Sequence, residues 1–342
     1  MIVINYLNKN EVGGTNTALN NFLKFLKNSP FFKNIIYIDK NIDQHNFSFL
    51  FKILSLRHQN YYFNSFFSPI TILSIFYLML ISCFKQIYIV ISPRGELSSD
   101  ALKQKHFKKI ISIFIIKLIL KNNVVFICSN KDEKKNTANI FKKHKCYLIE
   151  DVYFPSNPKL PTNKNKILFY SRIDRVKNVD FILNLYLKFK ISIPLDIYGP
   201  IIDKKYWAKC CDKINKVNIK NKIINYKGPV SQKKKFSVLK KYKIFILPSK
   251  SENFNYTLLE AIDSGCYIIC SKNLNNFNLK LHNNGINLDL KNKELWSKTI
   301  EKIYNNKNLF IKKTINYKRK KFFNNFKYEK VLKKYIDVLR IN

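Results

Sequence analysis

The chain has 342 residues, which at roughly 150 residues per domain predicts about two domains. Apolar residues make up 46% of it, enough for packed cores and too many for a disordered protein. Its 62 Lys and Arg against 22 Asp and Glu give a formal net charge of +40, which first suggests a polyanionic partner. Only six of those cations are Arg, however, and nucleic-acid surfaces favour Arg, so we expect mostly solvated lysine and no nucleic-acid partner.

The seven cysteines are odd in number and contain no C-x-x-C pair. This usage predicts buried free thiols in a reducing compartment, and neither a disulfide framework nor a zinc site. The first residues, MIVINYLNKNEVGG, are typical of a short strand and not of a secretion signal, so we expect a cytoplasmic protein.

Short β-branched and aromatic runs alternate with helical patterns from one end of the chain to the other. In the first half we predict strands at Ile2–Tyr6, Asn34–Ile38, Tyr61–Phe63, Gln86–Ile91, Val124–Cys128 and Cys146–Ile149. Helices fit between them at Thr15–Lys27, Thr71–Phe84, Ala101–Leu120 and Lys131–Lys142. In the second half the strands are Lys166–Tyr170, Leu195–Tyr198, Ile223–Tyr226, Lys243–Leu247 and Tyr267–Cys270. The pattern predicts an α/β protein of two doubly wound, parallel-sheet domains with a cleft between them.

The three prolines of Tyr153–Pro161 indicate the linker between the halves. We therefore predict domains over 1–158 and 159–318, and a C-terminal helical segment, 319–342, that packs back on the N-terminal domain. The uncharged stretch Ser65–Phe84 has the length of a membrane span, but Pro69 and the strand that follows favour a buried helix. The basic, aromatic residues 316–342 fit either an anionic membrane surface or a closing helix.

The most informative stretch is Lys243–Ser271, in which a strand, a polar loop and a helix follow one another. Glu252 lies in the loop and Glu260 in the helix, an E-x7-E spacing that can point both carboxylates at one pocket. Between them, the free amides at the start of the helix form an anion site that needs no metal. A sugar, a phosphate and a ribose could be held together there, although the two glutamates also fit ordinary structural roles.

A second cationic loop, FYSRIDRVKNVD, follows another strand. It places Arg172 and Lys177 at the carboxyl end of the strand, where open α/β sheets bind ligands. Together they could clamp a diphosphate and neutralise a leaving group. There is no D-x-D in the chain, so a metal-chelating diphosphate site lacks its usual ligands and no metal or other cofactor is expected.

These segments resemble the retaining glycosyltransferases of the GT-B fold in the large group 1 family (family 4), over nearly the whole chain. PSKSENFNYTLLEAIDSG is similar to that family's P-S-x-x-E-x-F-G-x-x-x-x-E-A-x-x-x-G, and SRIDRVKN to its G-R-L-x-x-x-K-G. LDIYGP and YKGPVS resemble its strand-end glycine motifs, and VGGTNTALNNF its N-terminal glycine loop. SPRGELSSDALKQKHFKK is similar to a segment of members encoded with bacterial surface-polysaccharide genes.

The resemblance implies a role for each matching residue. Arg172 and Lys177 would bind the donor diphosphate, Glu252 would bond the transferred sugar, and Glu260 would hold the nucleotide ribose. The remaining donor contacts would come from Asn253, Phe254, Asn255, Tyr256 and Gly199. The donor would be a UDP- or GDP-linked sugar. Transfer would retain the anomeric configuration by a front-face mechanism, in which the leaving phosphate helps to deprotonate the acceptor.

In the first half, Gly13 and Gly14 would let the first loop approach the donor phosphate and the acceptor. Many relatives also carry a cleft histidine there, but this chain has Ser-Pro-Arg-Gly-Glu in its place. Arg94 and Glu96 are therefore candidates for phosphate or acceptor contact, with a structural role for the Arg94 loop equally open. The acceptor would be a bacterial surface glycan, free or lipid-linked, reached from the inner face of the cytoplasmic membrane.

Two departures from the family pattern keep other functions open. Asn255 stands where the family has Gly, and the cleft histidine is missing. A GT-B epimerase or a non-catalytic GT-B partner subunit would fit these departures. A basic nucleic-acid-binding protein has only the net charge in its favour.

Overall fold

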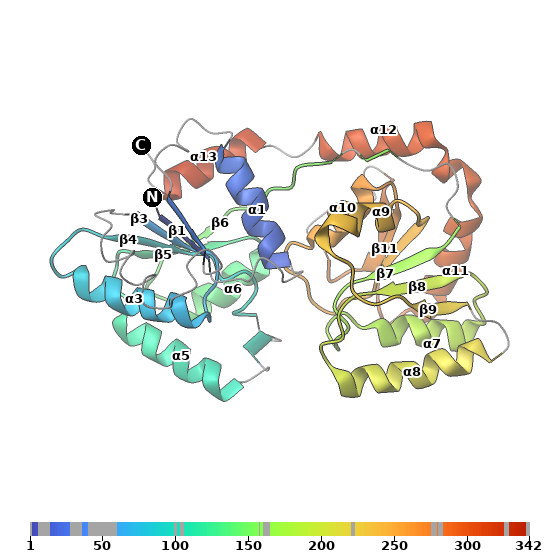
Figure 1. The fold of residues 1–342 in the computed structure, drawn as a ribbon, viewed down its shortest axis with the longest axis horizontal. Coiled ribbons are helices and arrows are strands. Elements are labelled where there is room, and N and C mark those ends of the chain that lie inside the picture. The colour runs from blue at the N-terminus through green and yellow to red at the C-terminus, as the bar shows by residue number, and fades with distance from the viewer. Residues whose placement is uncertain are drawn as a thin grey trace. The chain divides into compact units, whose positions relative to one another are not determined.

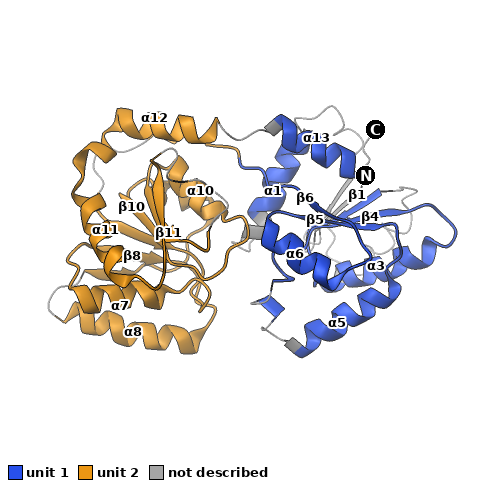
Figure 2. Ribbon diagram, turned by 180° about the vertical axis from the view of Figure 1, so that it is seen from behind, with its two compact units in different colours: residues 1–153, 327–342 blue, residues 154–326 orange. Residues whose placement is uncertain are grey.

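The computed structural model describes residues 2–5, 14–27, 36–39, 60–98, 101–102, 106–156, 158–159, 165–219, 223–274, 279, 283–324 and 328–339. The chain forms two compact units, coloured separately in Figure 2. Unit 1 holds residues 1–153 and 327–342, and unit 2 holds residues 154–326. The crossing after Tyr153 lies at the start of the proline-rich segment, five residues before our predicted boundary at 158, and the chain returns to unit 1 after residue 326.

Unit 1 contains one six-stranded parallel sheet in the order β2-β1-β3-β4-β5-β6. The strands are β1 (Ile2–Asn5), β2 (Ile36–Asp39), β3 (Asn60–Phe63), β4 (Tyr88–Ile91), β5 (Val124–Cys128) and β6 (Cys146–Leu148). The helices are α1 (Gly14–Lys27), α3 (Pro69–Ile81), α5 (His106–Ile119), α6 (Lys131–Ile140) and α13 (Tyr328–Leu339). The parallel α/β arrangement predicted for this half is confirmed.

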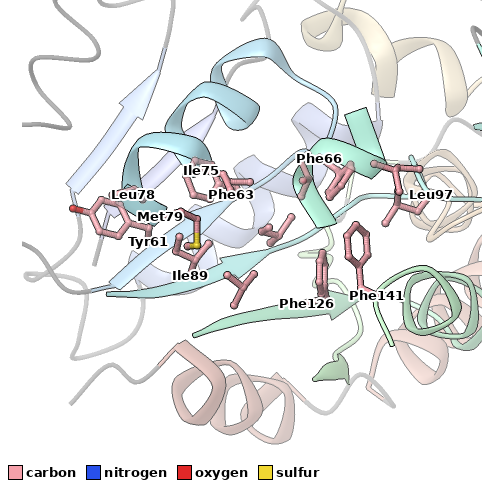
Figure 3. Close-up of a cluster of buried hydrophobic side chains, with 14 of the residues drawn as sticks. Tyr61, Phe63, Phe66, Ile75, Leu78, Met79, Ile89, Leu97, Phe126 and Phe141 are labelled. Atoms are coloured by element: carbon pink, nitrogen blue, oxygen red, sulfur yellow. The ribbon is translucent and has the colours of Figure 1, made fainter. Parts of the chain in front are cut away.

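Alternate residues of the central strands enter two different layers of unit 1. Tyr61 and Phe63 of β3 join a buried cluster with Ile75 of α3 and Ile113 of α5 (Figure 3). Tyr62, between them, contacts Phe22 of α1 on the other side of the sheet, with ring centroids 4.8 Å apart. Successive side chains of a strand point to opposite faces of the sheet, so a strand that is apolar at every position indicates a sheet buried on both faces.

The C-terminal helix α13 packs in that second layer. Its Tyr335 is fully buried, with the ring centroid 4.9 Å from that of Phe22 and 6.0 Å from that of Phe25. Asn60 of β3 donates a hydrogen bond of 3.3 Å to the Leu339 carbonyl. The apolar side of α13 is therefore occupied by its own unit.

Unit 2 repeats the design with the strand order β12-β11-β10-β7-β8-β9, all parallel. Its strands are β7 (Ile167–Tyr170), β8 (Leu195–Tyr198), β9 (Ile224–Tyr226), β10 (Ile244–Leu247), β11 (Tyr267–Ser271) and β12 (Gly285–Leu288). Its α-helices are α7 (Val179–Phe189), α8 (Lys204–Asn218), α9 (Lys235–Leu239), α10 (Tyr256–Asp263), α11 (Lys293–Asn305) and α12 (Lys312–Phe323). Two 3-10 turns, η2 (Gln232–Lys234) and η3 (Lys307–Phe310), precede α9 and α12. The order is that of a Rossmann sheet, with β7 as its first strand and β10 as its fourth.

The differences from the predicted elements are small and have local causes. Strand β12, with sequence GINL, was not predicted, because Gly and Asn are depleted in strands and hide its apolar residues. Helix α3 begins at Pro69, since Ser68 caps it by accepting a 3.1 Å hydrogen bond from the Thr71 amide. Among the described residues no helix is long and apolar enough to cross a membrane.

Candidate active site

The loops with the predicted donor residues leave adjacent strands of unit 2, β7 and β10. These two strands are the point at which the strand order of the sheet reverses. Loops at the carboxyl ends of strands diverge there, and open α/β sheets bind ligands in the resulting crevice. The sequence therefore brings its two chemical segments to the one place in this sheet where binding is most expected.

The loop after β7 is built around the buried carboxylate of Asp174. It accepts hydrogen bonds from the backbone amides of Val176 at 3.0 Å and Lys177 at 2.9 Å. Asn178 then takes a left-handed conformation, with φ of 60°, and donates to the carbonyl of Pro248 at 3.1 Å. This short turn sets the direction of the Lys177 side chain.

Backbone hydrogen bonds tie this loop to the loop after β10. The carbonyl of Val176 accepts from the Lys250 amide at 2.8 Å and from the Ser249 hydroxyl at 3.1 Å. Because Ser249 is fully buried, these bonds are shielded from water. The two loops thus form one rigid support.

Lys177 and Glu252 meet across this support. The Lys177 ammonium forms an ion pair with Oε1 of Glu252, and both side chains are mostly buried. Removing either partner would leave a charge that is partly shielded from water, which makes the pair costly to break. The structure therefore brings together two of the three residues predicted for chemistry.

Arg172, the third, points outward at the edge of the same loop. Its side chain is 55% exposed, and its guanidinium lies 3.5 Å from the carboxylate of Asp174. The other arginine of this loop, Arg175, is also exposed, and its guanidinium bonds the carboxylate of Asp203 at 3.0 Å. Arg172 thus has one ion-pair partner, Asp174, and leaves more than half of its side chain exposed for a ligand phosphate.

Helix α10 begins at Asn255, the residue that replaces the family's glycine. Asn255 has φ of 57°, a left-handed conformation that Asn tolerates better than most residues. Its side-chain oxygen caps the helix by accepting from the Leu258 amide at 3.1 Å. The substitution therefore keeps the backbone geometry that a glycine would have allowed. Phe254 and Tyr256 flank it, with ring centroids 4.9 Å apart.

Glu260 lies one turn further along α10 and is almost completely buried. Its carboxylate forms an ion pair with Lys235, the first residue of α9, which is 5% exposed. The Gln232 side chain also hydrogen-bonds the carboxylate. Burial raises the pKa of Glu260, and the Lys235 ammonium opposes that rise. The Lys235 ammonium also lies 5.5 Å from the centre of the Tyr170 ring, at the end of β7.

Gly199 supports the site by allowing a close approach. It follows β8 with φ of 142°, and a Cβ atom there would lie 1.8 Å from the carbonyl oxygen of Ser171. Ser171 is the first residue after β7, next to Arg172. Any side chain at position 199 would therefore displace the cationic loop.

The candidates in the first half belong to unit 1. Gly14 is the first residue of α1, and Gly13 lies outside the described residues. The loop after β4 keeps the side chains of Arg94 and Glu96 within unit 1. Arg94 forms an ion pair with Asp151 and bonds Asn64 and Tyr62, at 2.8 and 2.9 Å.

Glu96 is similarly committed. Its carboxylate accepts from the Ser65 hydroxyl at 3.0 Å and from the amides of Phe66 and Phe67. Arg94 itself has φ of 53°, so the loop is held in a conformation that its own contacts must stabilise. These contacts favour the structural role that the sequence left open, and the ligand roles of Arg94 and Glu96 stay predictions.

Two residues of this site were not predicted, Lys235 and Asp174. A buried Glu260 requires a cation, but in so lysine-rich a chain the sequence gives no reason to choose position 235. Asp174 could have been predicted, because the side chain of an Asp in a loop commonly accepts hydrogen bonds from backbone amides two and three residues later, in an Asx turn. Within the part of the chain that the structure describes, no three His, Cys, Asp or Glu side chains cluster as metal ligands would.

Comparison with known proteins supports the predicted fold. Residues 154–321 match the family described as glycosyl transferases group 1. The chain is 32% identical over 158 residues to the UDP-N-acetylglucosamine–peptide N-acetylglucosaminyltransferase GtfA subunit of Streptococcus agalactiae. That match covers 42% of this chain and 29% of the length of the relative.

Solved structures with the same fold include HepE of Anabaena in complex with UDP and glucose. It is 11% identical, covers 99% of both chains and has a TM-score of 0.70. TarM of S. aureus, in complex with Fondaparinux, α-GlcNAc-glycerol and UDP, is 16% identical with a TM-score of 0.59, over 82% of this chain and 55% of TarM. The predicted GT-B fold is therefore confirmed, and residues 154–321 of the chain are similar to the group 1 glycosyltransferases.

Proposed function

We propose that the protein is a retaining, metal-independent glycosyltransferase that transfers a sugar from a nucleoside-diphosphate donor to a bacterial surface glycan, free or lipid-linked. The observation that carries the proposal is the Lys177–Glu252 ion pair at the strand-order reversal of unit 2. Beside it lie an exposed arginine and the amino end of α10. Cations, a carboxylate and the amino end of a helix are the groups that a sugar diphosphate needs.

The donor diphosphate would lie over the loop after β7. Arg172 can approach a phosphate from solvent, and the ammonium of Lys177, which has three N–H donors, can bond the oxygen that gains charge as the sugar leaves while it keeps its ion pair with Glu252. Two fixed cations would thereby stabilise the leaving diphosphate in the transition state. Because side-chain cations supply this charge, the proposed reaction needs no metal ion.

Glu252 would orient the transferred sugar and not attack it. A carboxylate paired with an ammonium and mostly buried is a weak nucleophile, since its charge is already neutralised. We therefore assign retention to a front-face reaction, in which the departing phosphate takes the acceptor proton. Glu260 would hold the ribose, with the Lys235 ammonium favouring the ionised form of that carboxylate.

UDP is the donor nucleotide that we propose. Three relatives carry UDP or a UDP-sugar in their names: HepE, TarM and the streptococcal GtfA subunit. The acceptor is less constrained, because the GtfA subunit is named for a peptide acceptor and TarM was solved with a glyceryl sugar. The excess of lysine in this chain favours an acidic glycan over a neutral one, by electrostatic steering.

A non-catalytic partner subunit is the second candidate, and Asn255 and the missing cleft histidine were the two reasons to consider it. The left-handed backbone and intact helix cap of Asn255 remove the first reason, because the loop keeps the shape that glycine would give, and the missing histidine still stands. An epimerase would share the nucleotide site, and would be recognised by a change in the free donor when no acceptor is present.

Calorimetry of UDP, GDP, CDP and ADP, each with and without EDTA, tests the proposal. UDP should bind with unchanged affinity in EDTA. Arg172→Ala should weaken binding by about tenfold or more, as expected for one charge-assisted contact. Arg175→Ala is the matched control, since it removes an equally exposed arginine of the same loop. A folded protein that binds none of the four nucleotides would refute the donor site.

The configuration at the transferred sugar tests the mechanism separately. With a UDP-sugar that binds, NMR of the earliest product should show the anomeric configuration of the donor. An inverted product would overturn the proposed mechanism and leave the donor site standing.

A further inference from the structure

Two neighbouring helices of unit 1, α3 and α5, leave apolar faces exposed. Figure 1 and Figure 2 both show them side by side on one face of the sheet. In α5, Phe107, Phe114 and Leu118 are 78%, 62% and 71% exposed. The other exposed large apolar side chains of this region are Leu73, Phe76, Leu80, Phe84, Ile110, Ile111 and Ile115. So dense a patch on one side of a small domain marks an interaction surface.

Helix α5 is apolar on two opposite sides, and only one of them is used within the unit. Ile113 and Ile116 point into the buried cluster with α3. On the other side, Phe107, Phe114 and Leu118 fall within about 60° of one another at 3.6 residues per turn. A surface helix does not need this second stripe to fold.

Charge around the stripe is of one sign. Lys108 and Lys117, both exposed, lie about 90° to either side of the stripe, so that an ammonium borders each edge. Lys85 and Lys121 are exposed at the ends of the neighbouring segments. The sequence over 69–121 has two acidic residues: Glu96, whose carboxylate is bonded within unit 1, and Asp100, which lies outside the described residues.

We propose that this face, formed by the exposed side of α5 and the adjoining exposed residues of α3, docks on an anionic lipid bilayer. Apolar side chains would enter the interface, and the bordering lysines would reach the lipid phosphates along their flexible stems. The helices have 13 and 14 residues, about 20 Å at 1.5 Å per residue, which is too short to span a hydrocarbon core of about 30 Å. They would therefore lie in the plane of the membrane.

The charge of the protein decides against a second copy as the occupant. Each chain carries a formal charge of +40, so pairing two lysine-bordered faces would bring like charges together, whereas an anionic surface attracts them. The C-terminal helix α13 is a weaker candidate for the membrane contact than the sequence suggested. Its buried Tyr335, Val338 and Leu339 are already packed within unit 1.

Flotation of the full chain with vesicles tests the proposal without any donor or acceptor, so it can fail independently of the transferase function. The protein should float with vesicles of phosphatidylcholine and phosphatidylglycerol, and not with phosphatidylcholine alone. Phe107→Ser/Phe114→Ser/Leu118→Ser should weaken binding by about tenfold or more, because three apolar side chains no longer enter the interface. Lys108→Gln/Lys117→Gln should weaken it and reduce its salt dependence.

Matched controls come from exposed residues of unit 2. Ile219→Ser/Ile311→Ser removes exposed apolar side chains, and Lys209→Gln/Lys216→Gln removes two exposed charges from α8. Both should bind vesicles like the parent. Equal binding by the parent and the α5 variants would overturn the proposal. So would a change in sedimentation of the free protein with vesicle binding unaffected, since the face would then join copies of the chain.

Discussion

The buried ion pair between Lys235 and Glu260 gives the sharpest test of the site. Lys235→Met keeps the length of the side chain and removes its charge, so Glu260 loses its ion-pair partner. Because an unpaired carboxylate is too costly at 2% exposure, we expect Glu260 to take up a proton in the folded variant.

The magnitude follows from that proton. A carboxyl of ordinary pKa 4.5 is held protonated at a cost of about 1.36 kcal/mol for each pH unit above that value. At about pH 7 the cost is roughly 3.4 kcal/mol, and at about pH 5.5 roughly 1.4 kcal/mol. The higher figure falls within the roughly 3–5 kcal/mol measured when buried ion pairs lose one partner.

The sign is fixed by proton uptake. Between the unfolded and the folded pKa of Glu260, the folded variant holds a proton that the unfolded chain has lost, so its stability falls as pH rises. If the Lys235 ammonium keeps Glu260 ionised in the parent at both pH values, the loss relative to the parent should grow by about 2 kcal/mol between them. A loss that does not change with pH would refute the reasoning.

Tryptophan fluorescence during urea unfolding measures this loss in the right part of the chain, because both tryptophans, Trp207 and Trp296, lie in unit 2. Lys234→Met is the matched control, since it removes the exposed lysine next along the chain and should change stability little. The double variant Lys235→Met/Glu260→Gln removes both charges and should recover most of the loss at pH 7. Its UDP affinity then reports the contribution of the Glu260 carboxylate without an unpaired ammonium.

Three further outcomes follow from the geometry. Asn255→Ala should destabilise unit 2 by about 1–3 kcal/mol in urea unfolding, because Ala loses the cap and strains a φ of 57°, whereas Asn255→Gly should cost less than about 1 kcal/mol and keep UDP binding; equal losses would contradict the left-handed backbone. Gly199→Ala should abolish calorimetric UDP binding, since its Cβ would meet the Ser171 carbonyl at 1.8 Å and move the Arg172 loop; binding at parental affinity would show that this approach is unimportant. Lys177→Met should lower kcat by about 100-fold or more with UDP still bound, if its ammonium acts mainly on the leaving diphosphate; a change in KM alone would instead assign it to ground-state binding.

The fold was predictable because its signals are repeated along the chain. Each strand is a continuous apolar run between helical patterns, and parallel βα units can be arranged in only a few right-handed ways. The strand that escaped prediction, β12, carries Gly and Asn in a run of four. The unit boundary lies at the proline-rich segment, although nothing in that segment distinguishes Tyr153 from the residues that follow it.

The site was predictable only where the chemistry is local in sequence. Glu252 and Lys177 stand in loops whose positions follow from the strands, and the structure joins them. Lys235 is different, because its role depends on which of many lysines the fold turns toward Glu260. Which lysine pairs with Glu260 is decided by tertiary packing and cannot be predicted from the spacing of residues in the sequence.

Arg94 is the opposite case, a residue that the sequence suggested for ligand binding and that the structure bonds within its own unit. Its rarity in a lysine-rich chain and its place after a strand made it a candidate for binding a ligand, yet its guanidinium bonds Tyr62, Asn64 and Asp151 within unit 1. Arg172 has the same rarity and the same kind of position, but remains half exposed. What separates them is how far each side chain is enclosed: Tyr62, Asn64 and Asp151 surround the Arg94 guanidinium, and its side chain is 3% exposed, whereas Arg172 pairs only at its edge with Asp174 and is 55% exposed. A strand-end arginine is therefore a candidate ligand contact when packing leaves its side chain exposed, and the sequence around it does not show whether packing does so.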